Sequence, residues 1–173
     1  WRLVISSPLA LDTMALVRTV DGFLTTVHDV VAGEAIRRVV PVFNPAQNDN
    51  QVSVLRLVNP AVVPVTVRID GQDENGGDGP AAPVTLTMAP GTAIELTADD
   101  LEAGNAGKGL SGALGDGVGK WTLVVSSSKP IQVMGLLRAP RGFLTNLSTR
   151  ALAAGGDLLP RLAGAAVLRR PVS

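Results

Sequence analysis

The residues best suited to bind a ligand lie in one acidic, glycine-rich loop, DGQDENGGDG at 70–79. Its candidate ligands are Asp70, Asp73, Asn75 and Asp78, and calcium prefers such oxygen donors on a flexible loop. The spacing is not that of an EF-hand, because the alternating Asp/Asn order and the closing Glu are both missing. Asp, Asn and Gly also dominate ordinary turns. The loop is therefore a calcium candidate with a solvated turn as the favoured alternative, and no other cofactor is expected.

Histidine or cysteine catalysis has little support. His28 is the only histidine and cysteine is absent, so a triad, a histidine pair or a thiolate metal site lacks the partners it needs. The segment DDLE contributes Asp99, Asp100 and Glu102. We interpret these acids as favourable negative charge at the N-terminus of a helix. No catalytic residue is predicted, and the chain is not expected to be an enzyme.

The glycine-rich segment AGKGLSGALGDGVGK, at 106–120, suggests a phosphate-binding loop but does not match one. A P-loop requires Gly-Lys followed by Ser or Thr, whereas Trp121 follows Gly119-Lys120 and Leu114 replaces the first glycine. The dinucleotide fingerprint fails as well, because Lys120 stands where its last glycine should be. We interpret the segment as a tightly turned loop that leads into a strand at Trp121.

Composition narrows the class of protein. The 173 residues carry 15 Lys and Arg against 15 Asp and Glu, so no excess charge favours nucleic acid or an anionic membrane. Only 3% of residues are aromatic, too few for a stacking surface that binds sugars or single-stranded nucleic acid. No apolar run approaches the roughly 18 residues of a transmembrane helix. The chain begins with Trp and shows no signal peptide, so we expect a fragment or a processed piece.

Short strands separated by Gly, Pro and Asn turns must position these residues. Alternation predicts a half-buried strand at 63–69, with Val63, Val65, Val67 and Ile69 on the inner face. The segment 51–59 is apolar on both faces, which indicates a central strand, and Pro41 favours an edge strand at 37–43. Helix signals occur only at 97–104, where Thr97 is a plausible N-cap. Further strands are predicted at 83–88, 92–97, 120–127, 131–138 and 142–149.

The chain contains an internal repeat of domain length. Trp121 lies 120 residues after Trp1, and the thirty residues that follow each align without a gap. Identical pairs include Trp1/Trp121, Leu3/Leu123, Met14/Met134, Leu16/Leu136, Arg18/Arg138, Gly22/Gly142, Phe23/Phe143, Leu24/Leu144 and Thr25/Thr145. The offset exceeds the period of solenoid repeats and approaches the size of a β-sandwich. Since Ser148 matches His28, the repeat does not require a histidine.

Several motifs resemble an uncharacterised, immunoglobulin-like tandem repeat of secreted or cell-surface bacterial proteins, often found beside exported proteases. They are VPVFNP, NQVSVLRLVNP, LTADDLEAGN, GLSGALGDGVGKWTLVVSS, IQVMGLLR and GFLTNLS. The resemblance implies export and a non-enzymatic role, and it carries over no catalytic residue. The expected fold class is all-β: an immunoglobulin-like antiparallel β-sandwich with a partial second copy at the N-terminus.

These observations divide the chain into three parts. Residues 1–30 are expected to be the C-terminal strands of a preceding repeat, residues 38–150 a complete β-sandwich repeat, and residues 151–173 a loosely ordered tail. The N-terminal strands then need a cover. A longer array can supply it, another copy can supply it by strand addition, or the phase is different and 1–97 is the closed unit.

We expect a non-catalytic module that acts as a spacer, adhesive or assembly unit. Its partners would be neighbouring repeats of the same protein or other copies of itself. The alternative is an accessory domain of a secreted hydrolase that binds calcium or a polymer.

Overall fold

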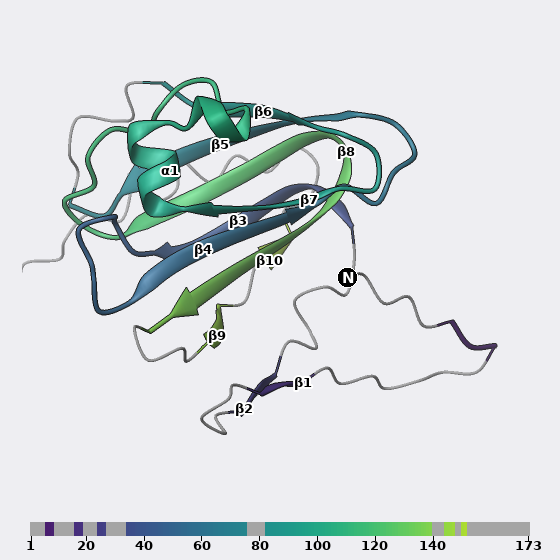
Figure 1. Ribbon diagram of the computed structural model, residues 1–173, viewed down its shortest axis with the longest axis horizontal. Coiled ribbons are helices and arrows are strands. Elements are labelled where there is room, and N and C mark those ends of the chain that lie inside the picture. Colours follow the sequence, from purple (N-terminus) through teal and green to yellow (C-terminus); the bar gives the residue numbers. More distant parts are fainter. Residues whose placement is uncertain are drawn as a thin grey trace, which may run out of the picture.

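The computed structural model describes residues 6–8, 16–18, 24–26, 34–75, 82–139, 144–147 and 150–151. Strands dominate this part of the chain, with one short α-helix and one turn of 3-10 helix (Figure 1). The predicted all-β class is therefore confirmed. Within the same ranges, no helix is long and apolar enough to cross a membrane.

The strands form two antiparallel sheets. A two-stranded sheet consists of β1 (Leu16–Arg18) and β2 (Leu24–Thr26). An eight-stranded sheet consists of β3 (Ala35–Phe43), β4 (Val52–Val58), β5 (Val65–Asp73), β6 (Val84–Met88), β7 (Ala93–Thr97), β8 (Trp121–Arg138), β9 (Leu144–Leu147) and β10 (Arg150–Ala151). The predicted tail beyond Ala151 lies outside the described residues.

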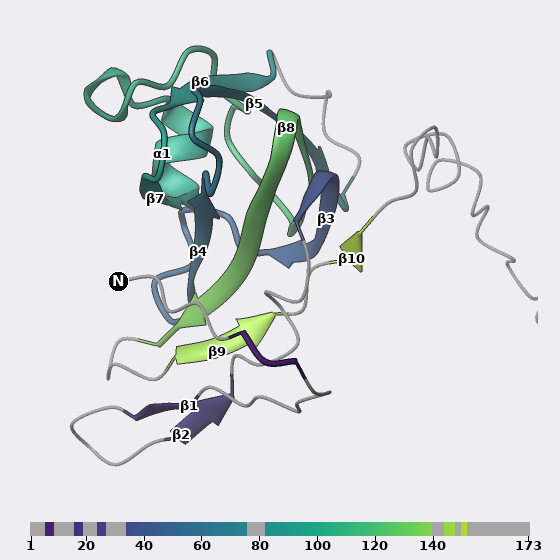
Figure 2. The same ribbon diagram turned by 90° about the vertical axis from the view of Figure 1, so that its right-hand side faces the viewer.

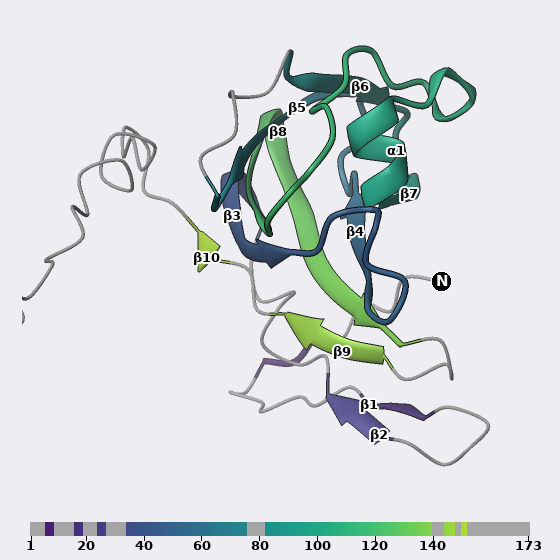
Figure 3. The same ribbon diagram turned by 90° about the vertical axis from the view of Figure 1, so that its left-hand side faces the viewer.

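Strand β8 belongs to both halves of the larger sheet. Its first half pairs with β3 and β5, and its second half pairs with β4 and β9. The sheet therefore curls around one interior (Figure 2 and Figure 3). The sequence predicted two strands, 120–127 and 131–138, and this was wrong: β8 is continuous. Pro130 is tolerated because it lies on an exposed stretch, between the Ser127–Val67 and Ile131–Ala35 pairs.

The interior is filled from both halves of the sheet. Trp121, predicted to lie in a core, is 4% exposed, and its matched residue Trp1 lies outside the described part of the chain. Burial of large apolar side chains supplies the main driving force for such a fold. The largest fully buried side chains include Phe43, Leu55, Leu57, Ile69, Leu96, Leu101, Leu123 and Ile131.

The alternation predicted for 63–69 holds within β5, where the inward side chains of Val65, Val67 and Ile69 are fully buried. Val63 was wrongly placed on this face, since it precedes the strand and is 43% exposed. The fully buried Asn59 explains the difference. Its side-chain amide donates to the carbonyl oxygen of Val63, at 3.0 Å, and to those of Met88 and Ala89. This buried amide fixes the turn before β5.

The central strand predicted at 51–59 is confirmed, because β4 lies between β7 and β8. The edge position predicted for 37–43 is wrong at Arg38 and Val39, which pair with β10. Pro41 is accommodated instead by a register shift between Val40 and Phe43. A bulge tolerates proline because the regular ladder is already interrupted there.

The predicted helix is also confirmed. Helix α1 (Ala98–Ala103) begins after the N-cap Thr97 and ends at Gly104. A single 3-10 turn, η2 (Ala106–Lys108), follows it and was not predicted.

The glycine-rich segment folds as a tight loop against β6. Ser111 and Thr85 exchange two backbone hydrogen bonds, of 2.9 and 2.8 Å, while Leu110 and Leu114 are buried in the core. Gly112 has φ of 87°, and a Cβ there would lie 2.2 Å from the carbonyl oxygen of Pro83. Glycine is required at this point because the backbones of the loop and the strand approach closely.

We expect Gly112→Ala to destabilise the protein by more than Gly109→Ala. Gly109 also has a positive φ, of 74°, but a Cβ there meets nothing within 4 Å. Its substitution should cost roughly 1–2 kcal/mol from the left-handed backbone alone, and overpacking should add about 1–3 kcal/mol at Gly112. Urea unfolding followed by circular dichroism measures the difference, and equal losses would contradict the close approach.

Candidate functional site

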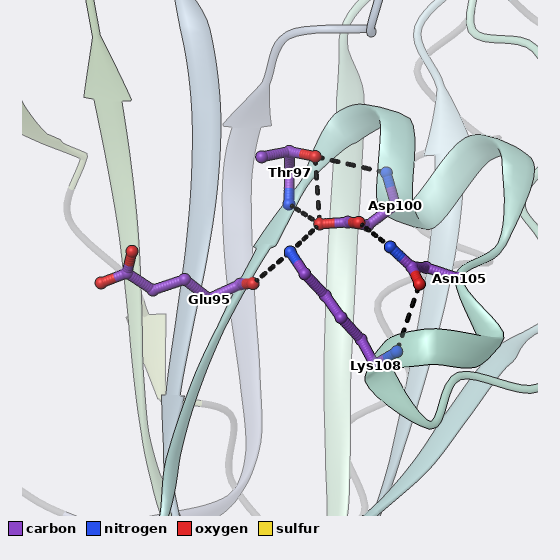
Figure 4. Close-up of polar contacts among 5 residues, drawn as sticks. All are labelled: Glu95, Thr97, Asp100, Asn105 and Lys108. Carbon is purple, nitrogen blue, oxygen red and sulfur yellow. Dashed lines mark hydrogen bonds and ion pairs between the residues drawn. The ribbon is translucent and has the colours of Figure 1, made fainter.

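The carboxylate of Asp100 is the centre of a closed polar cluster (Figure 4). It accepts hydrogen bonds from the backbone N–H and the hydroxyl of Thr97, at 2.8 and 3.1 Å. Asn105 donates from its side-chain amide at 2.6 Å, and the ammonium of Lys108 lies 2.5 Å away. The Thr97 hydroxyl in turn accepts from the Asp100 N–H, which completes a capping box. Both oxygens of this buried carboxylate are therefore occupied by donors from the chain.

These donors determine the ionisation of Asp100. Burial alone would raise the pKa of its carboxyl, but the ammonium of Lys108 and the donors on Thr97 and Asn105 outweigh burial, so the pKa is lowered. The sequence had assigned Asp100 to the start of a helix and had not identified Lys108 or Asn105 as its partners. The one local hint was Asn105, because asparagine is a common N-cap and Asn105 caps the short helix η2 that carries Lys108.

Glu102, buried at the other end of α1, ties the helix to β8. Its carboxylate accepts from the indole N–H of Trp121 at 2.7 Å and from the backbone N–H of Ala46 at 3.1 and 3.2 Å. A Cβ at Gly117 would lie 2.4 Å from the indole nitrogen, so the glycine leaves room for this contact. Glu102 thus joins three segments that are distant in the sequence.

Three of the four calcium candidates, Asp70, Asp73 and Asn75, lie in the described part of the chain. Both oxygens of Asp70 accept from the guanidinium of Arg68, at 2.6 and 2.9 Å. Asp73 accepts from the backbone N–H groups of Asn75, Val118 and Gly119, at 2.7–3.0 Å. Asp78 lies outside the described residues.

The carboxylate of Asp73 is held by backbone donors from its own turn and from the loop before β8. Burial would raise the pKa of its carboxyl, but the three backbone N–H groups outweigh burial and lower it. Across the ranges that the structure describes, no group of three or more His, Cys, Asp or Glu side chains is placed to hold a metal ion. His28 also lies outside those ranges.

Two edges of the curled sheet are partly occupied by the chain itself. The outer side of β6 pairs with the glycine-rich loop through the Thr85–Ser111 bridge. At β7 the ammonium of Lys108 donates to the backbone carbonyl of Glu95 at 2.9 Å while it contacts Asp100 (Figure 4). Occupied backbone groups and a lysine at an edge oppose strand addition. These two edges are therefore poor assembly sites.

Other edges of the described strands include β10, which pairs with β3 alone, and two hairpins of identical register. In the first, Leu16 lies opposite Thr26, Val17 opposite Thr25, and Arg18 opposite Leu24. In the second, β8 and β9 pair Leu136 with Asn146, Leu137 with Thr145, and Arg138 with Leu144. Each pair of the second hairpin lies 120 residues after the matching pair of the first.

The two hairpins also lie near each other, with β2 beside β9 (Figure 2 and Figure 3). Within the described residues β9 pairs only with β8, and β1 pairs only with β2. We define the paired strands of these two hairpins, β1 with β2 and β8 with β9, as the candidate assembly edge.

Comparison with known proteins adds information about the fold. The crystal structure of Thermotoga maritima 1070 is similar to this chain, with a TM-score of 0.50 and 14% identity over 69% of this chain and 97% of that one. At this identity the similarity concerns the fold alone. No family model and no curated protein matches the sequence.

We predict that Asp100→Asn lowers stability at neutral pH and weakens acid destabilisation. The pKa of Asp100 is lower in the folded protein than its ordinary value, so ionised Asp100 stabilises the fold above about pH 4. That stabilisation is lost as the pH falls through the lower, folded pKa. We expect a loss of about 1–3 kcal/mol at pH 7, and a smaller further loss in acid than the wild type shows.

Urea unfolding at neutral and acid pH measures both effects. Asp99→Asn is the matched control, because it removes one charge from the same first turn of α1. An Asp100→Asn variant that keeps the full acid sensitivity of the wild type would contradict this assignment.

Glu102→Ala should destabilise the protein by about 2–4 kcal/mol, because it leaves the buried indole N–H of Trp121 and the half-buried N–H of Ala46 without their acceptor. Glu102→Gln keeps one acceptor oxygen, and we expect about half of that loss. Tryptophan fluorescence in a Trp1→Phe background, recorded during urea unfolding, reports Trp121 directly. Equal stability of the alanine variant and the wild type would rule out a structural role for this contact.

Proposed function

We propose that this chain is a non-catalytic repeat module of an exported bacterial protein, built as an immunoglobulin-like β-sandwich, which joins its neighbours through the candidate assembly edge. In this proposal residues 1–30 are the end of a preceding repeat, and the unit that follows, predicted from the sequence at 38–150, is complete. The module acts as a spacer or adhesive unit whose partners are neighbouring repeats or other copies of itself.

The single observation that carries the proposal is the shared register of the two hairpins. Register is set by the pattern of inward side chains and by the turn, so two unrelated segments have no reason to share both. The β1–β2 and β8–β9 hairpins have the same register at one constant offset of 120 residues. That offset is the one at which the two tryptophans and two of the phenylalanines match in sequence.

The acidic side chains support a structural role. Asp100 takes part in the capping box of α1, and Asp70 pairs with Arg68. Glu102 binds Trp121 of β8 and the backbone of Ala46. Asp73 binds the backbone of Val118 and Gly119, just before β8. Catalytic carboxylates act on substrate atoms within hydrogen-bond reach. Each of these four has its oxygens turned toward donors of its own chain, which favours a module that binds through its backbone edges.

The immunoglobulin-like form and the export of the module rest on the sequence resemblance. The curled antiparallel sheet is compatible with that form, although β8 is shared by its two halves. Absence of cysteine is compatible with export, since it avoids unwanted oxidation.

Light scattering over a concentration series tests the assembly role. We expect the mass of the full chain to rise above that of a monomer at high concentration, because edge strands without partners pair with other chains. Val17→Lys, within β1, should reduce this association, since a charged edge opposes strand pairing. The matched control is Val62→Lys, which changes a valine that is 91% exposed and lies outside both hairpins.

A monomer at every concentration would exclude assembly by the isolated chain. Equal effects of the two lysine variants would indicate general surface attraction rather than pairing at β1.

A further inference from the structure

In the second hairpin, β8 has a pairing partner on each of its two edges. Strand β8 pairs with β9 on one edge and with β4 on the opposite edge. The β4 ladder places Val52 opposite Arg138, Ser53 opposite Leu137, and Val54 opposite Leu136. These are the same β8 residues that pair with β9, so this part of β8 is flanked on both sides.

The first hairpin has only half of this arrangement. Leu16, Val17 and Arg18 are the counterparts of Leu136, Leu137 and Arg138. They pair with β2 as the β8 residues pair with β9, but in the described part of the chain no strand takes the place of β4. By analogy with the β4–β8 ladder, a strand on this side of β1 would be antiparallel and would have a defined register.

We infer that the outer edge of β1 receives an antiparallel strand of the β4 type, from a neighbouring repeat, with the Ser53 position opposite Val17. The inference rests on the proposed repeat equivalence and adds to it the identity of the partner strand. By the same register, the Val52 position lies opposite Arg18 and the Val54 position opposite Leu16.

The β4 strand of a second folded copy is a poor donor. It is held between β7 and β8, and its Leu55 and Leu57 side chains are fully buried. Releasing it would expose both leucines and break two ladders. The donor is therefore a β4-type strand that is not already paired with a folded β8 strand.

A disulfide test uses the absence of cysteine from the chain. The full chain carrying Val17→Cys is mixed, in a glutathione redox buffer, with a synthetic peptide of the sequence QVSVLRLVN, residues 51–59, that carries Ser53→Cys. Lysines added at the ends of the peptide keep it soluble. Directly opposed residues of an antiparallel pair lie within the range of Cα distances that a disulfide spans. Mass spectrometry measures the yield of the mixed disulfide.

Two controls test the predicted strand register and measure non-specific disulfide formation. A peptide with Val54→Cys instead of Ser53→Cys moves the thiol to the opposite face of the strand. A chain with Val62→Cys presents the thiol at an exposed position away from β1. Melting of the reduced Val17→Cys chain at the wild-type temperature verifies that the variant is folded.

We expect the Val17–Ser53 adduct to exceed both controls by about tenfold or more, because strand pairing raises the effective concentration of the two thiols. Equal yields in all mixtures would overturn the inference. If light scattering shows association that depends on Val17 but the peptide is not captured in register, the assembly role stands and the partner strand is wrong. A monomer that also fails to capture the peptide removes both proposals.

Discussion

The architecture depends on one strand that serves two parts of the sheet. Strand β8, of 18 residues, pairs with β3 and β5 along its first half and with β4 and β9 along its second. Antiparallel strands twist, so a strand of this length carries its neighbours around the core instead of across it. The curl and the single interior follow from this continuity, because the two parts of the sheet share β8.

Polar residues also contribute to this architecture, because they occupy backbone groups at the edges of the sheet. Lys108 neutralises Asp100 and at the same time occupies the carbonyl of Glu95 at the β7 edge. The glycine-rich loop occupies the β6 edge. Within the described residues, contacts from the chain therefore occupy backbone groups at the β6 and β7 edges, whereas β1, β9 and β10 each pair on one side only. In the proposed assembly role, this uneven distribution would favour association away from β6 and β7.

Sequence patterns predicted the elements well where the stabilising interactions lie between residues close together in the chain. The inward face of β5, the capping of α1 by Thr97 and the central place of β4 were all visible in side-chain type and spacing. Errors arose where distant residues compete with local signals. Pro130 suggested a break within β8, yet paired segments on both sides carry the strand past it. Val63 continued an alternating pattern, yet the amide of Asn59 holds its carbonyl in a turn.

By itself, the sequence determined the all-β class, the helix and the 120-residue repeat, because these depend on side-chain periodicity and identity along the chain. The tertiary structure alone decided which carboxylates are occupied, which edges are closed and that the two hairpins share a register. Those features arise from contacts such as Glu102 with Trp121 or Asp73 with Gly119. The curl of the sheet brings these residues together, and because they are far apart in the sequence, local spacing does not predict the contacts.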